Sequence, residues 1–384
     1  MPPAVSTLDK AEVAEQGGRM RRLGATLIPV AVLTALALTL PASTSAAPGH
    51  AGAKPQKHDP FKDGWTETVI DADQSFRGLE AVSRKEAWVT GESLTDGGPA
   101  RVFRTTDRGE TWTDVSPADT AGLSFRDVEV HGKVAHVLAI GPGEASRIYR
   151  STDGGASWTE SFRNTDEKAF YDCMAFYGNG RRGLAVSDPV DGKLRILSTD
   201  DRGRSWKVLP SKGMPASDAE FGFAASGDCL VTAGRAAFII TGGAKSRVLK
   251  SVDRGLTWTA VESGIPAGDA AGGFAGAFAS PHRGIAVGGD FADAEDTADT
   301  TAYTRNGRTW ATGGDLTHIG EDVTVLHGWR YAVATGDYDD SVGSSVTSDG
   351  GATWQRVSDL GYHAIDCVGK VCWAAGSKGR VGHN

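Results

Sequence analysis

Apolar and polar residues alternate along most of the chain, in short segments separated by turn residues. Residues 125–130 and 134–140 are one such pair of segments, and Gly141 follows the second. Because alternation with a period of two places every second side chain on one face of a strand, each segment is predicted to be a half-buried β-strand. A third and a fourth strand follow before the next pair begins. Helical periodicity is missing after residue 46, so we expect almost no helix.

One eight-residue turn recurs between the third and fourth strands of each group. It reads Ser/Thr, any residue, Asp, any residue, Gly, any residue, Ser/Thr, Trp, and its copies span residues 105–112, 151–158, 199–206, 251–258 and 347–354. A shortened copy, residues 304–310, has Asn306 where the others have aspartate. The tryptophans of these six copies follow one another at intervals of 44 to 52 residues. One period therefore holds four strands and their turns, the size of a propeller blade.

This turn resembles the Asp-box, also called the bacterial neuraminidase repeat, which occurs in β-propellers. The order of strands and turns across the chain is similar to that of the photosystem II stability and assembly factor group, whose bacterial relatives are often labelled oxidoreductases. Each aspartate would accept hydrogen bonds from the amides of its own turn, so the carboxylates would lie far apart at the periphery and could not converge on one substrate. We expect a structural role, with the tryptophans in the core, for Asp107, Trp112, Asp153, Trp158, Asp201, Trp206, Asp253, Trp258, Asp349 and Trp354.

The number of repeats predicts an all-β, seven-bladed propeller of four-stranded blades. Three strands near the C-terminus, residues 362–368, 371–375 and 379–383, lack a fourth, and residues 64–70 form a spare strand near the N-terminus. Pairing these two ends in one sheet would hide its edges and close the ring. Six blades is the alternative if the repeat around Asn306 or the terminal blade does not form.

The first residues are predicted to direct export. Arg21 and Arg22 precede an apolar run, residues 23–40, and small residues follow at 43–47, which is the pattern of a secretory signal peptide ending near residue 46. Met20 is an alternative start, and a membrane anchor is the alternative interpretation. Residues 47–63 are predicted to be a flexible tether and residues 64–384 a single propeller domain, secreted and without stable membrane insertion after cleavage.

Four cysteines in an exported chain predict two disulfides. Cys367 and Cys372 flank a short turn between neighbouring strands, a separation that a hairpin bridge can span. Cys173 and Cys229 would then pair by elimination. A redox couple at the first pair is disfavoured, because it has neither Cys-x-x-Cys spacing nor a helix start.

Charge and motifs exclude several functions. The chain has 40 basic and 48 acidic residues, a net charge of −8, and no basic block, which argues against nucleic acid as a partner. Residues 141–146 resemble a dinucleotide-binding loop but lead into a strand, and their third glycine is a serine. A sialidase would need a third arginine beside Arg77 and Arg126, and an Arg-Ile-Pro segment. A quinone- or metal-dependent dehydrogenase remains an alternative.

Functional residues are expected where the repeat is broken, at the loops around the central channel. The positions at which the innermost strands begin predict a mixed aromatic and charged rim for a ligand or partner. The candidates are Arg77, Arg126, Tyr171, Asp172, Glu220, Glu321, Tyr362 and His363. Acidic loops at residues 187–192, 288–293 and 336–340 could hold a hard cation, but ordinary turn chemistry is favoured.

The combined expectation is an exported, non-catalytic, monomeric propeller that binds another protein or a surface ligand and needs no cofactor. The competing hypothesis is an enzyme on the same propeller, either a cofactor-dependent oxidoreductase or a glycan-active, sialidase-like hydrolase.

Overall fold

The computed structural model describes residues 59–62 and 64–384. The predicted signal peptide, residues 1–46, and most of the predicted tether lie outside these residues. The described chain forms strands and three short 3₁₀ turns, η1 (Gly143–Ala145), η2 (Ser211–Gly213) and η3 (Ser377–Gly379), without an α-helix. No helix in this part of the chain is long and apolar enough to cross a membrane.

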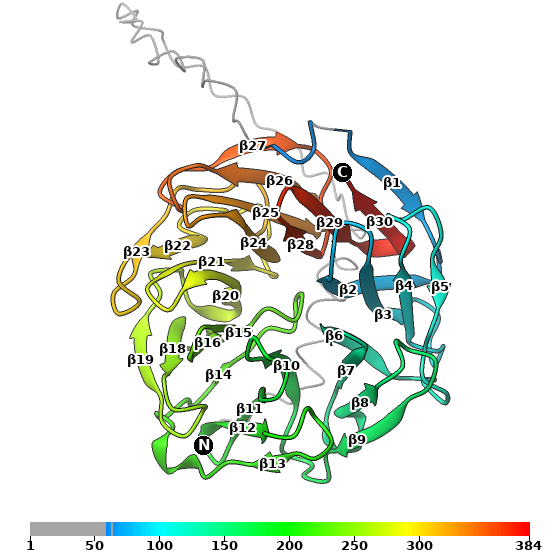
Figure 1. Ribbon diagram of the computed structural model, residues 1–384. Coiled ribbons are helices and arrows are strands. Elements are labelled where there is room, and N and C mark those ends of the chain that lie inside the picture. The colour runs from blue at the N-terminus through cyan, green and yellow to red at the C-terminus, as the bar shows by residue number, and fades with distance from the viewer. Residues whose placement is uncertain (1–58, 63) are drawn as a thin grey trace, which may run out of the picture.

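The strands form antiparallel sheets arranged around a central axis, as the alternating pattern predicted (Figure 1). Residues 59–62 and 64–384 form six sheets, four of four strands, one of six and one of eight. The eight-stranded sheet contains two four-strand meanders, joined through a single pair of residues, Glu92 and Ser124. Its strands are β2 (Gln74–Ala81), β3 (Ala87–Ser93), β4 (Arg101–Thr105), β5 (Thr113–Asp114), β6 (Ser124–His131), β7 (Val134–Ile140), β8 (Arg147–Ser151) and β9 (Thr159–Arg163).

The next sheets repeat the meander, with one interruption. Two short strands, β14 (Glu220–Phe221) and β17 (Gly242–Gly243), join the six-stranded sheet, whose other strands are β20 (Gly268–Ser280), β21 (Arg283–Asp290), β22 (Thr301–Thr304) and β23 (Ala311–Thr312). Three regular sheets contain β10 (Tyr171–Phe176), β11 (Gly183–Val190), β12 (Lys193–Thr199) and β13 (Lys207–Val208); β15 (Leu230–Ala233), β16 (Ala236–Ile240), β18 (Arg247–Ser251) and β19 (Thr259–Glu262); and β24 (Asp322–His327), β25 (Tyr331–Tyr338), β26 (Ser341–Thr347) and β27 (Gln355–Ser358).

The remaining sheet joins the two ends of the described chain. It contains β28 (Ala364–Val368), β29 (Val371–Ala375), β30 (Arg380–His383) and β1 (Thr66–Val69), with β1 outermost. Strands β1 and β30 pair antiparallel, with Thr66 opposite His383. This is the pairing that the spare N-terminal strand predicted.

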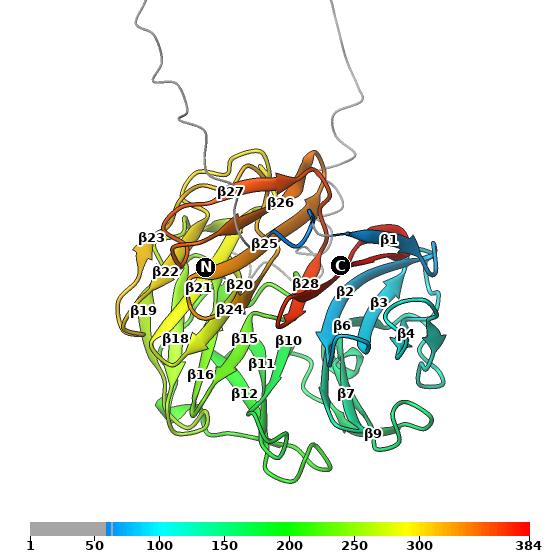
Figure 2. The same ribbon diagram turned by 45° about the horizontal axis from the view of Figure 1, so that its top comes forward.

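Strand direction gives the ring two different faces. The innermost strands run the same way along the axis, as β2 and β28 show in Figure 2. Because neighbouring strands are antiparallel, two kinds of loop lie on the same face: those that lead into an innermost strand, and those that connect a second strand to a third strand. We call this the mouth face. The opposite face, which we call the turn face, carries the hairpins after the innermost strands and the repeated aspartate turns.

The aspartate turns are closed by their own side chains. In the first copy, Asp107 Oδ1 accepts from the Thr111 amide at 3.0 Å and Oδ2 from the Thr111 hydroxyl at 2.5 Å. The same two bonds recur at Asp153, Asp201, Asp253 and Asp349. The Thr111 hydroxyl and amide lower the pKa of Asp107 to about 2. Each carboxylate is therefore engaged within its own turn.

The tryptophan after each turn packs against the preceding sheet. Trp158 meets Trp88 edge to face, with ring centroids 6.4 Å apart, and donates to the Val115 carbonyl. Trp258 is fully buried, whereas Trp112, Trp158, Trp206 and Trp354 are only half-buried. The expectation of core tryptophans thus holds completely for Trp258 alone. The four half-buried tryptophans pack against apolar clusters that lie between neighbouring sheets.

Both predicted disulfides are present. Cys367–Cys372 links the adjacent strands β28 and β29, and Cys173–Cys229 links β10 to the residue before β15.

Candidate functional site at the channel mouth

A segment of the chain, residues 222–229, crosses the centre of the ring; we call it the plug. Figure 1 shows the connection between β14 and β15 reaching toward the axis. Arg77 Nη1 on β2 donates to the Ala225 carbonyl at 3.1 Å, and the Gly276 amide on β20 donates to the Asp228 carbonyl at 3.1 Å. Arg126 on β6 reaches the Ala224 carbonyl. Innermost strands from different sides of the ring thus hold one segment at the axis.

The plug corrects the prediction for Glu220. Because residues 222–229 are inserted, the innermost strand of this sheet is β15, and Glu220 lies ahead of the plug on β14. Its carboxylate is fully buried and bound to the Arg247 guanidinium and the Thr241 hydroxyl. Glu220 therefore stabilises the base of the plug and does not belong to a ring of equivalent entry positions.

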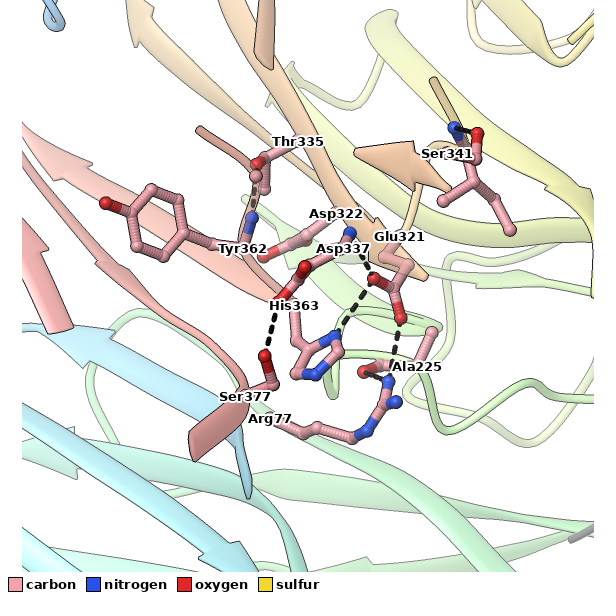
Figure 3. Close-up of polar contacts among 12 residues, drawn as sticks. Arg77, Ala225, Glu321, Asp322, Thr335, Asp337, Ser341, Tyr362, His363 and Ser377 are labelled. Atoms are coloured by element: carbon pink, nitrogen blue, oxygen red, sulfur yellow. Dashed lines mark hydrogen bonds and ion pairs between the residues drawn. The ribbon is translucent and has the colours of Figure 1, made fainter. Parts of the chain in front are cut away.

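Glu321 is the centre of the polar network at the mouth. Its Oε1 accepts from Arg77 Nη1 at 2.8 Å, and its Oε2 accepts from His363 Nδ1 at 3.0 Å and from the Asp337 amide at 2.7 Å (Figure 3). Burial alone would raise the pKa of Glu321, but His363 and Arg77 facing it lower that pKa to about 2. The structure thus brings together three of the predicted rim residues, which come from β2, the start of β24 and the start of β28.

Arg126 forms a second ion pair next to this network. Its Nη2 lies 2.9 Å from Glu92 Oε1. Burial lowers the pKa of Arg126 to about 10, and the opposite charge of Glu92 limits that shift. Arg77 and Arg126 each divide their donors between a carboxylate and the plug, so neither is an uncommitted ligand-binding group.

The aromatic candidates point elsewhere. Tyr171 is fully buried in the apolar cluster between two sheets. The Tyr362 hydroxyl donates to Glu67 at 2.5 Å and accepts from Trp65 Nε1 at 2.9 Å, so it ties β28 to the N-terminal strand. Asp172 is buried as well. These three side chains are not exposed at the mouth.

Carboxylates also line the axis below the mouth, a feature that the sequence prediction missed. Three of them link neighbouring innermost strands: Asp127 accepts from the Met174 amide at 2.6 Å, Asp322 from Ile365 at 2.7 Å and Asp366 from Ala81 at 2.9 Å. Burial raises the pKa of every member of the set, which also includes Glu80, Glu129 and Asp228.

Among the described residues, no group of His, Cys, Asp and Glu is arranged to hold a metal ion. A visible signal for the axial carboxylates was an acidic residue at a position where the alternating pattern calls for an apolar one, as at Asp127 of residues 125–130.

Charge is distributed unequally between the two faces. Acidic residues dominate the loops of the mouth face, including the three predicted acidic loops, for example Asp191, Asp293, Glu295, Asp296, Asp299, Asp339 and Asp340. Basic residues dominate the hairpins and turns of the opposite face, for example Arg84, Lys133, Arg182, Arg202, Arg204, Arg235, Arg254, Arg305, Arg308 and Arg330. The turn face is therefore basic, although the chain as a whole carries a net negative charge.

Comparison with known proteins identifies the fold. No family model and no curated protein matches the sequence. The structure of YCF48 bound to D1 peptide is similar over 85% of this chain and 96% of that one, with a TM-score of 0.59 and 16% identity. YCF48 from Cyanidioschyzon merolae is similar over 83% and 98%, with a TM-score of 0.54 and 18% identity. A chain of the mitotic checkpoint complex matches 91% of this chain and 98% of its own length, with a TM-score of 0.54 and 14% identity. These likenesses show a shared propeller-like, all-β fold.

Proposed function

We propose that the protein is a seven-bladed β-propeller and one domain, with each four-strand meander as a blade. The two meanders of the eight-stranded sheet count separately, because one residue pair joins them. The strands β14 and β17 belong to the base of the plug and not to a blade. The side-chain bonds of the aspartate turns support their identification as Asp-boxes. Two disulfides support a site of action outside the cytoplasm, since such bonds persist in oxidising compartments.

Its function in this proposal is that of a non-catalytic, monomeric scaffold that binds another protein, similar in role to an assembly factor. The observation that carries this proposal is the plug. Propellers commonly place ligands at the central channel, but here the chain itself occupies the axis and uses Arg77 and Arg126 to hold its position. The mouth network is also internally paired, because both oxygens of Glu321 have donors. A partner would then engage the loops of the mouth face.

The partner segment in this proposal is basic. The longest described loop between a second and a third strand, residues 291–300, carries four exposed carboxylates, Asp293, Glu295, Asp296 and Asp299. Asp339 and Asp340 are exposed in the hairpin between β25 and β26, which belongs to the next sheet along the chain. Such a surface attracts and orients a cationic segment, and the attraction weakens as salt is added.

Site-specific photo-crosslinking in the native host tests the proposal. A crosslinker at position 296 or 340 should capture a protein, and capture should decrease as ionic strength rises. The same crosslinker at Thr152, exposed on the turn face, is the matched control. The triple charge reversal Asp293→Lys, Glu295→Lys, Asp296→Lys should abolish capture from position 340 without lowering thermal stability. Equal capture from Thr152, or a stoichiometric chromophore or metal in the purified protein, would contradict a non-catalytic scaffold acting through the mouth face.

A further inference from the structure

A row of arginines crosses three neighbouring sheets on the turn face. Among the described residues, the turn-face loops of the β10–β13, β15–β19 and β20–β23 sheets present seven exposed arginines and one exposed carboxylate, Asp200. We call these arginines the arginine arc: Arg181, Arg202, Arg204, Arg235, Arg254, Arg305 and Arg308. The positive charge of the turn face is therefore concentrated on one side of the ring.

The arc is continuous from one sheet to the next. Figure 1 shows the three sheets following one another around the axis. Arg182 of the first sheet and Arg235 of the second line the same hollow. Lys250 on β18 donates from Nζ to the carbonyls of Pro281 at 2.7 Å and Gly307 at 3.1 Å, which ties the second sheet to the third. A broad, flat partner could thus meet all three sheets at once.

The shortened copy of the turn, residues 304–310, adds charge to the arc without weakening the turn. Each full-length copy is neutral or negative, whereas this copy has two arginines and no acidic residue. Its Asn306 Oδ1 still accepts from the amides of Arg308 at 2.8 Å and Thr309 at 2.9 Å. The turn therefore keeps its hydrogen bonds while it loses the carboxylate.

Arginine also stands where the turn geometry favours glycine. The fourth position of the turn has φ of 66° at both Arg202 and Arg254, and other copies have Gly154 and Gly350 there, with φ of 74° and 79°. A residue with a Cβ is disfavoured in this left-handed conformation. Strain that persists in a fold indicates a use for the side chain. Folding alone does not account for arginine at these two positions.

Large apolar side chains are exposed in the middle of the arc. Val252 is 68% exposed and Leu256 is 52% exposed, and both belong to the turn that holds Arg254. The copy at residues 151–158 has Thr152 and Ala156 at these positions, so the turn does not require apolar residues there. Apolar side chains among cations are typical of surfaces that lie in the headgroup region of a membrane.

The arc ends beside a partly exposed tryptophan, Trp329, in the hairpin between β24 and β25. Three guanidinium carbons lie around its ring, those of Arg283 at 4.2 Å, Arg330 at 5.1 Å and Arg305 at 5.8 Å from the centroid. The ring attracts each cation and so gathers like charges that repel one another. Tryptophan is enriched at the level of lipid headgroups, because one part of its ring is apolar and the other donates a hydrogen bond.

We propose that the arginine arc docks the turn face on the surface of a bilayer that contains anionic phospholipids, without spanning it. The guanidinium groups would bind lipid phosphates, which the planar fork of arginine fits in a bidentate manner. Val252 and Leu256 would enter the headgroup region and lose contact with water. The proposal does not rest on the protein-binding function of the mouth face, which would point away from the membrane.

Binding of residues 47–384, the predicted mature chain, to lipid vesicles tests the proposal. Co-sedimentation compares vesicles of phosphatidylcholine alone with vesicles of equal parts of phosphatidylcholine and phosphatidylglycerol. We expect binding to the anionic vesicles that weakens as salt is added, and little binding to the neutral ones. Absence of binding to anionic vesicles, or equal binding to both kinds, would overturn the proposal.

Glycine variants test the arc without damaging the turn. Arg254→Gly should weaken vesicle binding about fivefold, and Arg202→Gly with Arg254→Gly about 30-fold, as expected for one and two basic residues at an anionic surface. The melting temperature should not fall, since glycine suits this conformation. Arg108→Gly is the matched control: Arg108 has φ of 69° at the same position of its turn but lies outside the arc, beside Asp107 and Glu110. Equal losses in Arg108→Gly and Arg254→Gly would contradict a role for the arc.

An apolar variant distinguishes a membrane from a soluble polyanion. Val252→Thr with Leu256→Ala gives this turn the residues of the copy at 151–158, so the fold should be unaffected. Its binding to anionic vesicles should weaken about fivefold, because less apolar surface enters the headgroup region. An acidic protein or a sulfated polysaccharide would be bound through charge alone. Unchanged vesicle binding in this variant would therefore overturn the membrane assignment in favour of a soluble polyanion.

Discussion

Replacing Glu321 with glutamine should destabilise the protein strongly at neutral pH and weakly at acidic pH. The carboxylate is fully buried and accepts from Arg77, His363 and the Asp337 amide. Glutamine keeps the size of the side chain but removes the charge. The loss is therefore a measure of what the negative charge contributes to the network at the channel mouth.

The magnitude follows from the pKa of Glu321. Its pKa is about 2 in the folded protein, against an ordinary value of 4.5. A pKa that is lowered by folding stabilises the folded state above the unfolded pKa, and this contribution is lost as the pH falls toward the folded pKa. At 1.36 kcal/mol per pKa unit, the charge contributes about 3 kcal/mol at pH 7. At pH 3 about 1.5 kcal/mol remains. Breaking a buried ion pair costs a similar amount, about 3 to 5 kcal/mol.

Urea unfolding of the natural protein and of Glu321→Gln at pH 7, 5 and 3 measures the difference directly. We expect equal differences at pH 7 and 5 and a difference about half as large at pH 3. Glu144→Gln is the control, because the Glu144–Arg163 pair is exposed and its loss should cost less than about 1 kcal/mol. A Glu321→Gln difference below about 1 kcal/mol at pH 7, or one that is the same at pH 3, would refute the reasoning.

Three further outcomes are expected. Burial raises the pKa of Asp228 to about 7. Its protonated form therefore stabilises the fold at low pH, and this stability is lost as the pH rises through 7. In urea unfolding, Asp228→Asn should be neutral at pH 4 and stabilising by about 2 to 4 kcal/mol at pH 8. Deletion of residues 64–70 should lower the melting temperature markedly, because β30 loses β1, the strand paired with its outer edge, and an unchanged value would contradict closure of the ring through β1. Trp258→Ala should cost about 3 to 5 kcal/mol, more than the same change at the half-buried Trp158, and equal losses would contradict the difference in burial.

The regular part of the fold was predictable because its signals are local. A turn that closes through its own aspartate and threonine does not depend on the rest of the molecule, so each copy could be recognised in isolation. The pairing of β1 with β30 followed from one missing strand at one end and one spare strand at the other. The disulfide between Cys367 and Cys372 followed from two neighbouring strands.

The candidate site was predictable only in part, because its residues meet through the ring closure and not through the sequence. Arg77, Glu321 and His363 were each identified as positions where an innermost strand begins. Their mutual pairing depends on how far each strand advances toward the axis, and no local pattern encodes that distance. Glu220 was misplaced because an insertion without periodicity, residues 222–229, separates it from the strand that it was expected to begin.

The plug explains why the departures from the repeat carry most of the information about function. In a regular blade the sequence is fixed by packing between sheets, and the same residue types return at each period. At residues 222–229 this constraint is absent, yet the segment is held by arginines from two innermost strands, β2 and β6, and by a disulfide at Cys229. Because the plug lies at the mouth face and the aspartate turns lie on the opposite face, changes to one face should leave the other intact.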